Sequence, residues 1–155
     1  MTQPSHIFVV GSGRAGTTLV REILNKSEDV AICGETRFLN DGPFRRGFQH
    51  KFAGAGDMST DAGARRVVDY IYHDLRDGAF WGWVKENVAQ EQFLHRLLAS
   101  DRTDRSLLDL AMEAYADGKA VRGEKTPAHI YSLPTLIEWF PDAKFIHMMR
   151  CLLYT

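Results

Sequence analysis

A short apolar segment runs directly into a glycine-rich turn near the start of the chain. Residues 7–10 read Ile-Phe-Val-Val, and residues 11–18 continue as Gly-Ser-Gly-Arg-Ala-Gly-Thr-Thr. A continuous apolar run of this kind is typical of a buried parallel strand. Apolar residues at helical spacing follow the turn. The segment therefore predicts a strand, a phosphate-binding turn and a helix over residues 17–26, which is how many α/β folds begin.

The turn resembles a nucleoside-triphosphate loop but lacks its lysine. Gly11 and Gly16 have the spacing of G-x-x-x-x-G-K-[ST], whereas Thr17 stands in the lysine position. Backbone amides at a helix N-terminus favour an anion, and the Arg14 guanidinium suits phosphate or sulfate oxygens. A plain glycine-rich turn is the alternative. Arg14 together with Thr17 and Thr18 favours an anion site that is not built for ATP.

The rest of the chain alternates short apolar runs with helical patterns. Thr60 and Thr103 are candidate helix N-caps, and Gly78 and Gly118 are candidate stops. This order of elements predicts an α/β fold of three layers, with a parallel sheet flanked by helices. We expect further strands at 30–33, 120–123 and 143–149, helices at 61–77, 90–100, 104–117 and 130–140, a long loop at 40–60 and an irregular stretch around Trp81 and Trp83.

Composition bounds the class of protein. The chain has 155 residues, of which 45% are hydrophobic, and its net charge is -1, so one globular domain is expected and no basic field points to nucleic acid or an anionic membrane. Cys33 and Cys151 form neither a disulfide framework nor a zinc pattern, and the six histidines show no metal-ligand spacing. With no apolar run long enough for a signal peptide or membrane span, we expect a cytoplasmic protein.

Charged residues follow the other expected strands as well. Glu35 follows the second strand, Lys125 follows the weak third strand, and Arg150 ends the last one. In open α/β sheets, ligands bind outside the carboxyl ends of the strands. Together with the glycine-rich turn, these residues predict one site at that edge. Taken singly, Lys125 reads equally as a solvated lysine, Arg150 as a strand-end cation and Glu35 as a surface or capping carboxylate.

Four segments resemble sulfotransferases that use 3′-phosphoadenosine 5′-phosphosulfate (PAPS). The match covers residues 7–38 and 123–150, and the middle third of the chain matches nothing recognisable. The segments are Gly13-Arg14-Ala15-Gly16-Thr17-Thr18-Leu19, similar to the 5′-phosphosulfate loop; Gly34-Glu35-Thr36-Arg37, similar to the base-carrying segment of the tyrosylprotein sulfotransferase branch and its bacterial relatives; Gly123-Glu124-Lys125-Thr126-Pro127; and the strand from Phe140 to Arg150 that leads into the 3′-phosphate site.

The resemblance implies a role for each residue. Residues 13–18 would bind the cofactor, with Arg14 and Lys125 as a charge clamp on the transferred group. Glu35 would be the general base toward the acceptor hydroxyl, helped by an apolar pocket. Arg37 would orient Glu35 or contact an acidic acceptor, and Arg150 would hold the 3′-phosphate. PAPS is the implied co-substrate and 3′,5′-ADP the product, with no metal and an acceptor that is a tyrosyl peptide, a carbohydrate or a small molecule.

The family pattern after Arg150 is missing from the sequence. The family continues with an Asp or similar residue and a later Ser that binds the 3′-phosphate, whereas this chain reads Cys-Leu-Leu-Tyr-Thr at 151–155. We therefore expect residues 1–150 to be the N-terminal part of an incomplete sulfotransferase domain and residues 151–155 to be a non-native tail. A fragment of this kind could lack activity. The rival functions are a P-loop nucleotide kinase or NTPase and a non-catalytic anion-binding module.

Overall fold

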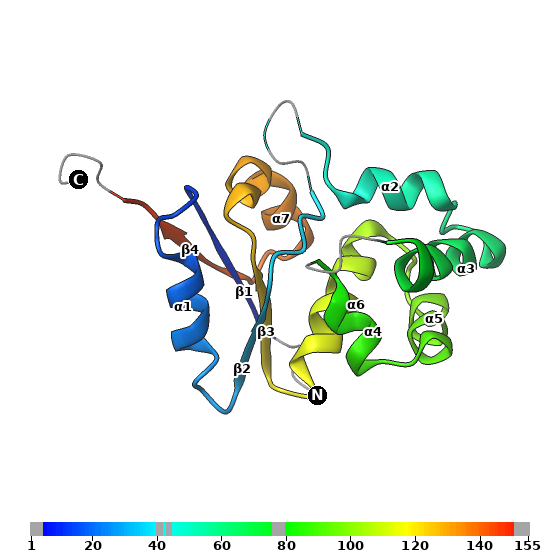
Figure 1. Cartoon of the computed structure of the whole chain (residues 1–155), viewed down its shortest axis with the longest axis horizontal. Helices are drawn as coiled ribbons and strands as arrows, with labels where there is room; N and C mark the ends of the chain where they lie inside the picture. The colour runs from blue at the N-terminus through cyan, green and yellow to red at the C-terminus, as the bar shows by residue number, and fades with distance from the viewer. Residues whose placement is uncertain (1–4, 40–41, 43–44, 76–79, 151–155) are drawn as a thin grey trace.

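A parallel sheet forms the centre of the molecule. The computed structural model describes residues 5–39, 42, 45–75 and 80–150 (Figure 1). Within them, four strands lie in the order β2-β3-β1-β4, and all pairs are parallel. The predicted α/β fold is confirmed. The strands are β1 (Ser5–Gly11), β2 (Val30–Cys33), β3 (Val121–Lys125) and β4 (Lys144–Met148).

Helices cover both faces of the sheet, which gives the predicted three layers. In Figure 1, α1 (Thr17–Leu24) lies on one side of the strands, and the helices from the middle of the chain lie on the other side. The elements on that second side are α2 (Phe48–Ala55), α3 (Asp61–Asp69), the π-helical turn η1 (Tyr70–Asp74), α4 (Gly82–Asn87), α5 (Gln90–Ala99), α6 (Asp104–Ala116), the 3₁₀ turn η2 (Pro127–Ser132) and α7 (Leu133–Trp139).

The main core lies between the sheet and the middle helices. Phe8 and Val10 point into it from β1, and Leu107 and Met112 meet them from α6. Side chains alternate across a strand, so Val9 is buried on the opposite face of β1, which α1 covers.

α1 is attached to the sheet in a different way from the one its sequence suggests. Leu19 and Ile23 share the apolar face expected from the helical pattern, yet they are 65% and 61% exposed. The helix is instead tied to β2 by polar contacts: Arg21 Nε donates to Ile32 O (2.9 Å), and the Asn25 amide pairs with the Ile32 N–H and C=O. These contacts orient the helix so that Leu19 and Ile23 face outward.

Residues 40–60 do not form one continuous loop, contrary to prediction. α2 occupies Phe48–Ala55, because Phe48 and Phe52 lie one turn apart and both are buried against the core. Two apolar residues among glycines give too weak a period to predict this helix. The Phe52 ring meets Trp81 edge-on, with centroids 4.9 Å apart.

The stretch around the tryptophans is also more regular than expected. α4 begins directly after Trp81, which is completely buried and donates its indole N–H to Thr36 O (2.8 Å). Trp83 donates to Ala111 O (2.9 Å). Both tryptophans therefore pack in or against the core.

Other helix boundaries are mostly as predicted. Thr60 and Thr103 cap α3 and α6 through their hydroxyl oxygens, and α6 ends at Ala116, just before Gly118. The helix predicted over 61–77 is α3 followed by the π-helical turn to Asp74, and its expected stop at Gly78 lies outside the described residues. The helix predicted over 130–140 is the end of η2 followed by α7.

Candidate active site

Glu35 and Lys125 meet at the carboxyl edge of the sheet. Glu35 lies two residues after β2, and Lys125 is the last residue of β3, so the pairing of these strands brings the two together. Lys125 Nζ donates to Glu35 Oε1 at 2.9 Å. Lys125 is 8% exposed, which places its charge in a largely dehydrated position. The predicted convergence of these two residues is therefore observed.

Arg37 lies on the other side of the same carboxylate. Its Nε donates to Glu35 Oε2 at 3.1 Å, and its guanidinium lies over the Phe80 ring, 4.7 Å from the centroid. Arg37 has a φ of 46°, in the left-handed region, where a non-glycine residue is strained. Arg37 therefore contacts the Glu35 carboxylate directly.

These ion pairs set the charge state of Glu35. Partial burial opposes ionisation, but the hydrogen bonds and positive charges of Lys125 and Arg37 outweigh it, and the pKa of Glu35 is lowered from its ordinary value. This differs from the expected apolar pocket, which would raise the pKa. Glu35 is therefore an anion held between two cations.

The glycine-rich loop lies beside the same edge. Gly11 ends β1 with a φ of 145°, and a Cβ there would lie 2.1 Å from Met148 O of β4, so only glycine fits. Ser12 N donates to that same carbonyl (3.3 Å), and Ala15 N donates to Ser12 O (3.3 Å). The Ala15 amide is therefore engaged within the loop. It is not left open for an anion, although Ala15 is one of the residues 13–18 expected to bind the cofactor.

The start of α1 keeps open donors. The amides of Gly16, Thr17 and Thr18 donate to no backbone carbonyl among the described residues. They are the orphan donors of a helix N-terminus, and no side chain caps them. The end of the loop can therefore receive an anion.

Arg14 and Arg150 are exposed cations near this loop. Arg14 has a φ of 61° in the left-handed region and makes no hydrogen bond or ion pair to a described residue. Arg150 lies two residues beyond β4, whose Met148 pairs with Gly11, and it too makes no hydrogen bond or ion pair to a described residue. The residues predicted for the tail, 151–155, lie outside the described part of the chain.

A cavity joins the loop to Glu35 and Arg37. It has a volume of about 340 Å³ and is lined by Gly11, Ser12, Gly13, Glu35, Arg37, Pro127, Ala128 and Tyr131. Residues 11–13 of the loop form one side of it, and the half-buried Glu35 carboxylate lies on the other side. Pro127 belongs to a segment already quoted from the sequence, whereas Ala128 and the exposed Tyr131 were not singled out. Their position directly after the Lys125-Thr126 segment is the one signal that could have indicated them.

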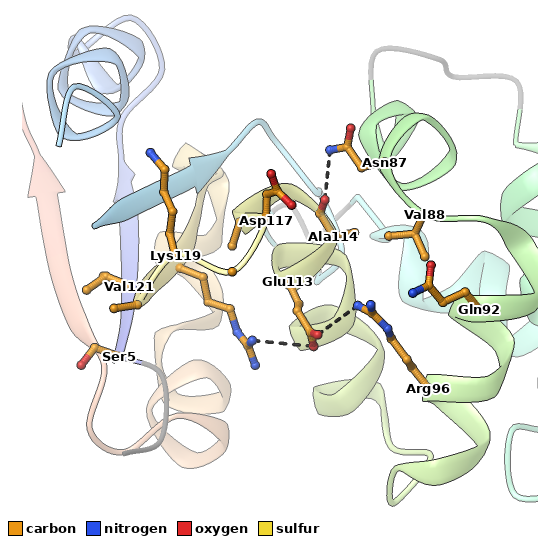
Figure 2. A pocket seen from close by; sticks show the side chains of 14 residues that line it. Ser5, Asn87, Val88, Gln92, Arg96, Glu113, Ala114, Asp117, Lys119 and Val121 are labelled. Carbon is orange, nitrogen blue, oxygen red and sulfur yellow. Dashed lines mark hydrogen bonds and ion pairs between the residues drawn. The ribbon is translucent and has the colours of Figure 1, made fainter. Parts of the chain in front are cut away.

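A larger cavity lies at the opposite end of the sheet, where the strands begin. It has a volume of about 740 Å³, and Figure 2 shows Glu113 at its wall between two arginines. Glu113 pairs with Arg96 (3.0 Å) and, more distantly, with Arg122 (3.7 Å). Lys119, the third cation of the lining, donates to the carbonyls of Ser27 and Val30. The cations of this cavity therefore have protein partners, in contrast to Arg14 and Arg150 at the carboxyl edge.

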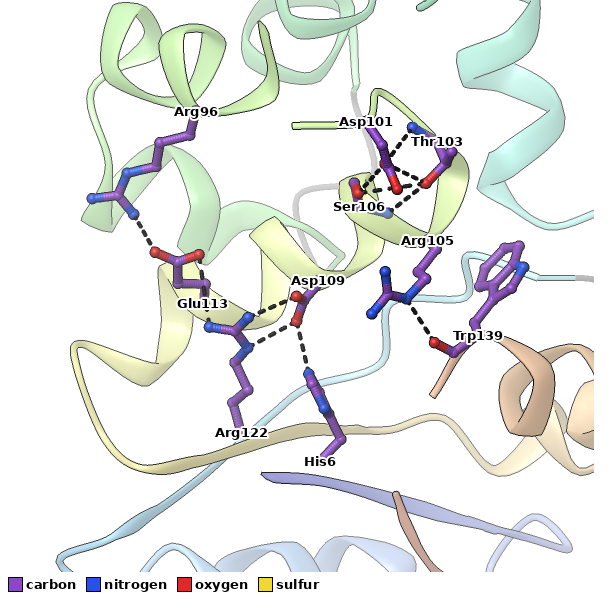
Figure 3. A network of polar contacts seen from close by, with 10 residues as sticks. All are labelled: His6, Arg96, Asp101, Thr103, Arg105, Ser106, Asp109, Glu113, Arg122 and Trp139. Atoms are coloured by element: carbon purple, nitrogen blue, oxygen red, sulfur yellow. Dashed lines mark hydrogen bonds and ion pairs between the residues drawn. The ribbon is translucent and has the colours of Figure 1, made fainter. Parts of the chain in front are cut away.

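Asp109 anchors β1 and β3 to α6 near the same cavity (Figure 3). It accepts from Arg122 Nε and Nη2 (2.8 and 2.6 Å) and from His6 Nε2 (2.8 Å). Burial raises the pKa of Asp109, but the His6 and Arg122 hydrogen bonds outweigh this effect, so the pKa is lowered. This network is a structural clamp at the end of the sheet away from Glu35.

The described residues contain no group of histidines, cysteines and carboxylates arranged to hold a metal ion. None of the helices in the described ranges is long and apolar enough to cross a membrane.

A parallel sheet whose first strand ends in an anion-accepting loop, with charged residues gathered at the same edge, defines a P-loop-like α/β protein. The sequence profile of the sulfotransferase family matches residues 4–154 of the chain. The chain belongs to the sulfotransferase family. Among curated proteins, none matches the chain.

Proposed function

We propose that the protein transfers a sulfuryl group from PAPS to an acceptor hydroxyl. The observation that carries this proposal is the Glu35–Lys125 pair, with Nζ and Oε1 2.9 Å apart. Glu35 lines a cavity whose opposite wall is the glycine-rich loop. A carboxylate that can take a proton and a cation that can stabilise transferred oxygens are what the reaction needs. Membership of the sulfotransferase family supports this choice over other P-loop-like chemistry.

The residues present suit the donor molecule. The open amides of Gly16, Thr17 and Thr18 and the Arg14 guanidinium would hold the phosphosulfate, and Arg150 would hold the 3′-phosphate. When bound, PAPS supplies a sulfuryl group on a good leaving group. The new bond joins the acceptor oxygen to sulfur, the phosphate–sulfur linkage breaks, 3′,5′-ADP leaves, and the hydroxyl proton goes to Glu35.

Lys125 has two tasks in this scheme. In the ligand-free protein its ammonium neutralises Glu35. An anionic sulfuryl group in the cavity competes for that ammonium, and any shift of Lys125 toward it weakens the pair. Glu35 then becomes a stronger base at the point in the cycle where a base is needed.

The Gly34-Glu35-Thr36-Arg37 segment supports the finer proposal that the protein lies near the tyrosylprotein branch and its bacterial relatives. The acceptor itself is proposed only as a hydroxyl on a tyrosyl peptide, a carbohydrate or a small molecule. The proposed domain spans residues 1–150.

Two measurements test the function. Calorimetry compares 3′,5′-ADP with ATP and Mg²⁺, and we expect preference for 3′,5′-ADP. Preference for ATP would favour a nucleotide kinase or NTPase instead. Transfer of ³⁵S from labelled PAPS to tyrosyl, carbohydrate and small-alcohol acceptors then tests catalysis. Tight 3′,5′-ADP binding with no transfer to any acceptor would favour a non-catalytic anion-binding module.

A further inference from the structure

A carboxylate is buried directly beneath the Glu35–Lys125 pair. Glu124 precedes Lys125 in β3, and its side chain points to the opposite face of the sheet, where it is 1% exposed. An isolated buried carboxylate is very unfavourable unless donors surround it. Glu124 has three: the hydroxyls of Thr36 and Thr126 donate to Oε2, and His129 Nδ1 contacts Oε1.

The protonation of His129 follows from its second contact. The Leu39 amide donates to His129 Nε2 at 3.1 Å, and a backbone N–H can only donate. Nε2 is therefore the acceptor nitrogen, and Nδ1 carries the proton that it donates to Glu124. His129 is completely buried, so this neutral imidazole links a buried anion to a backbone amide.

The network holds the segment that carries Glu35. Thr36 donates to Glu124 through its hydroxyl and to Thr126 Oγ1 through its amide (3.0 Å), and its carbonyl accepts from Trp81. Leu39 is held by His129. Glu35 thus lies directly before a residue fixed at its amide, carbonyl and side chain, and the short segment from Thr36 to Leu39 is fixed at both ends.

The same network holds the segment that carries Lys125. Glu124 and Thr126 flank Lys125 in sequence, and His129 lies in η2, which follows immediately. The base and its cation come from positions 90 residues apart, yet each is adjacent to a member of one buried hydrogen-bonded cluster.

We propose that Glu124 and His129 are positioning residues, a buried acid–imidazole pair that sets the distance and angle between Glu35 and Lys125. The catalytic part of this inference rests on the proposed sulfuryl transfer. Neither residue lines the cavity between the glycine-rich loop and Glu35. They act through Thr36, Leu39 and Thr126.

Glu124→Gln tests the pair with nearly unchanged volume. The new side-chain NH₂ is a hydrogen-bond donor, and it would face another donor, either the His129 Nδ1–H or a threonine hydroxyl. At least one hydrogen bond of the network is therefore lost. We expect kcat to fall by about 10²-fold, the scale of a misplaced catalytic group, while the affinity for 3′,5′-ADP stays within about twofold. The pKa of Glu35, followed by ¹³C NMR of its carboxyl, should rise toward its ordinary value as Lys125 and Arg37 lose their alignment.

The variant His129→Asn tests the two hydrogen bonds of the imidazole, to Glu124 and to the Leu39 amide, separately. Its side-chain NH₂ can still donate to Glu124, whereas the acceptor for the Leu39 amide is lost. We expect the same rise in the pKa of Glu35 on a smaller scale, and a changed ¹⁵N amide shift for Leu39. This variant also serves as the test if Glu124→Gln does not fold.

Leu97→Ala is the matched control. Leu97 is a completely buried core residue of α5, so its truncation lowers Tm without touching the network. The inference is wrong if Leu97→Ala changes kcat and the Glu35 pKa as much as Glu124→Gln does. It is also wrong if both network variants leave the Glu35 pKa unchanged. Absence of transfer by the wild-type protein would overturn the proposed function alone, because the Glu35 pKa and the Nδ1–H signal of His129 would still decide the positioning role.

Discussion

Lys125 and Glu35 form a 2.9 Å ion pair across the ends of two neighbouring strands, and Lys125 is almost completely removed from solvent. Coulombic attraction is stronger in such a place than at the surface. The pair therefore controls both the charge state of the candidate base and the position of the candidate clamp. Each of these roles can be tested separately.

Lys125→Met should reduce sulfuryl transfer by roughly 10²–10³-fold, the usual effect of losing one preorganised charged donor. The same change should raise the pKa of Glu35, since Lys125 contributes to lowering it. Rates with labelled PAPS and carboxyl ¹³C titration measure the two effects. Lys26→Met, an exposed residue beyond α1, provides the control, and equal losses in both variants would exclude a specific role for Lys125.

Glu35→Gln should nearly abolish transfer and leave 3′,5′-ADP affinity close to that of the wild type, because Glu35 is the proposed base and lies across the cavity from the loop proposed to bind the nucleotide. In the wild type the base must be ionised, and its pKa is lowered. The kcat/KM value, which reports the free protein, should therefore decline only as pH falls below the ordinary glutamate range. Normal turnover by Glu35→Gln would remove Glu35 as the base, and Glu28→Gln is the exposed control.

Arg14→Gly should separate binding from stability. Relief of the left-handed φ of 61° is worth about 1–2 kcal/mol, against roughly 0.5–1 kcal/mol for the greater freedom of glycine. Stability in urea should therefore be unchanged or higher. Affinity for 3′,5′-ADP should fall by about 10–100-fold, as expected for a lost charged hydrogen bond of about 1.5–3 kcal/mol. Unchanged affinity would place Arg14 outside the anion site.

Asp109→Asn should destabilise the fold by about 1.5–3 kcal/mol, the value of hydrogen bonds to a charged group. Because the pKa of Asp109 is lower in the folded protein, its contribution is fully present above the unfolded pKa and is lost as pH falls through the folded pKa. The stability difference between wild type and variant should therefore shrink in acid. Urea unfolding across pH measures it, with the exposed Asp142→Asn as the control. A constant difference at all pH values would contradict this assignment.

Much of the site could be predicted from local sequence. The apolar runs gave β1, β2 and β4, and the rule that ligands gather at the carboxyl ends of parallel strands placed Glu35 and Lys125 together. The order of the strands could not be predicted, because nothing local specifies that β3 lies between β1 and β2.

The buried chemistry was harder to foresee. Glu124 lies in a strand at a position whose side chain faces the core, and only its partners make that burial possible. Those partners come from residues 36, 126 and 129, and the histidine spacing in the sequence did not single out His129. α2 and α4 were missed because tertiary packing around Trp81, rather than a long helical period, stabilises them.

The strand order has a consequence for how the chain is made. β1 and β2 follow each other in sequence but do not pair, since β3 lies between them. While residue 125 of a growing chain is still inside the ribosome, β1 and β2 are therefore present without β3, the strand that lies between them. The sheet closes only when a late segment inserts between two early ones, a nonlocal step that is intrinsically slow. The last residue of the inserted strand is Lys125, so closure of the β2-β3-β1 part of the sheet and the pairing of Lys125 with Glu35 are the same event.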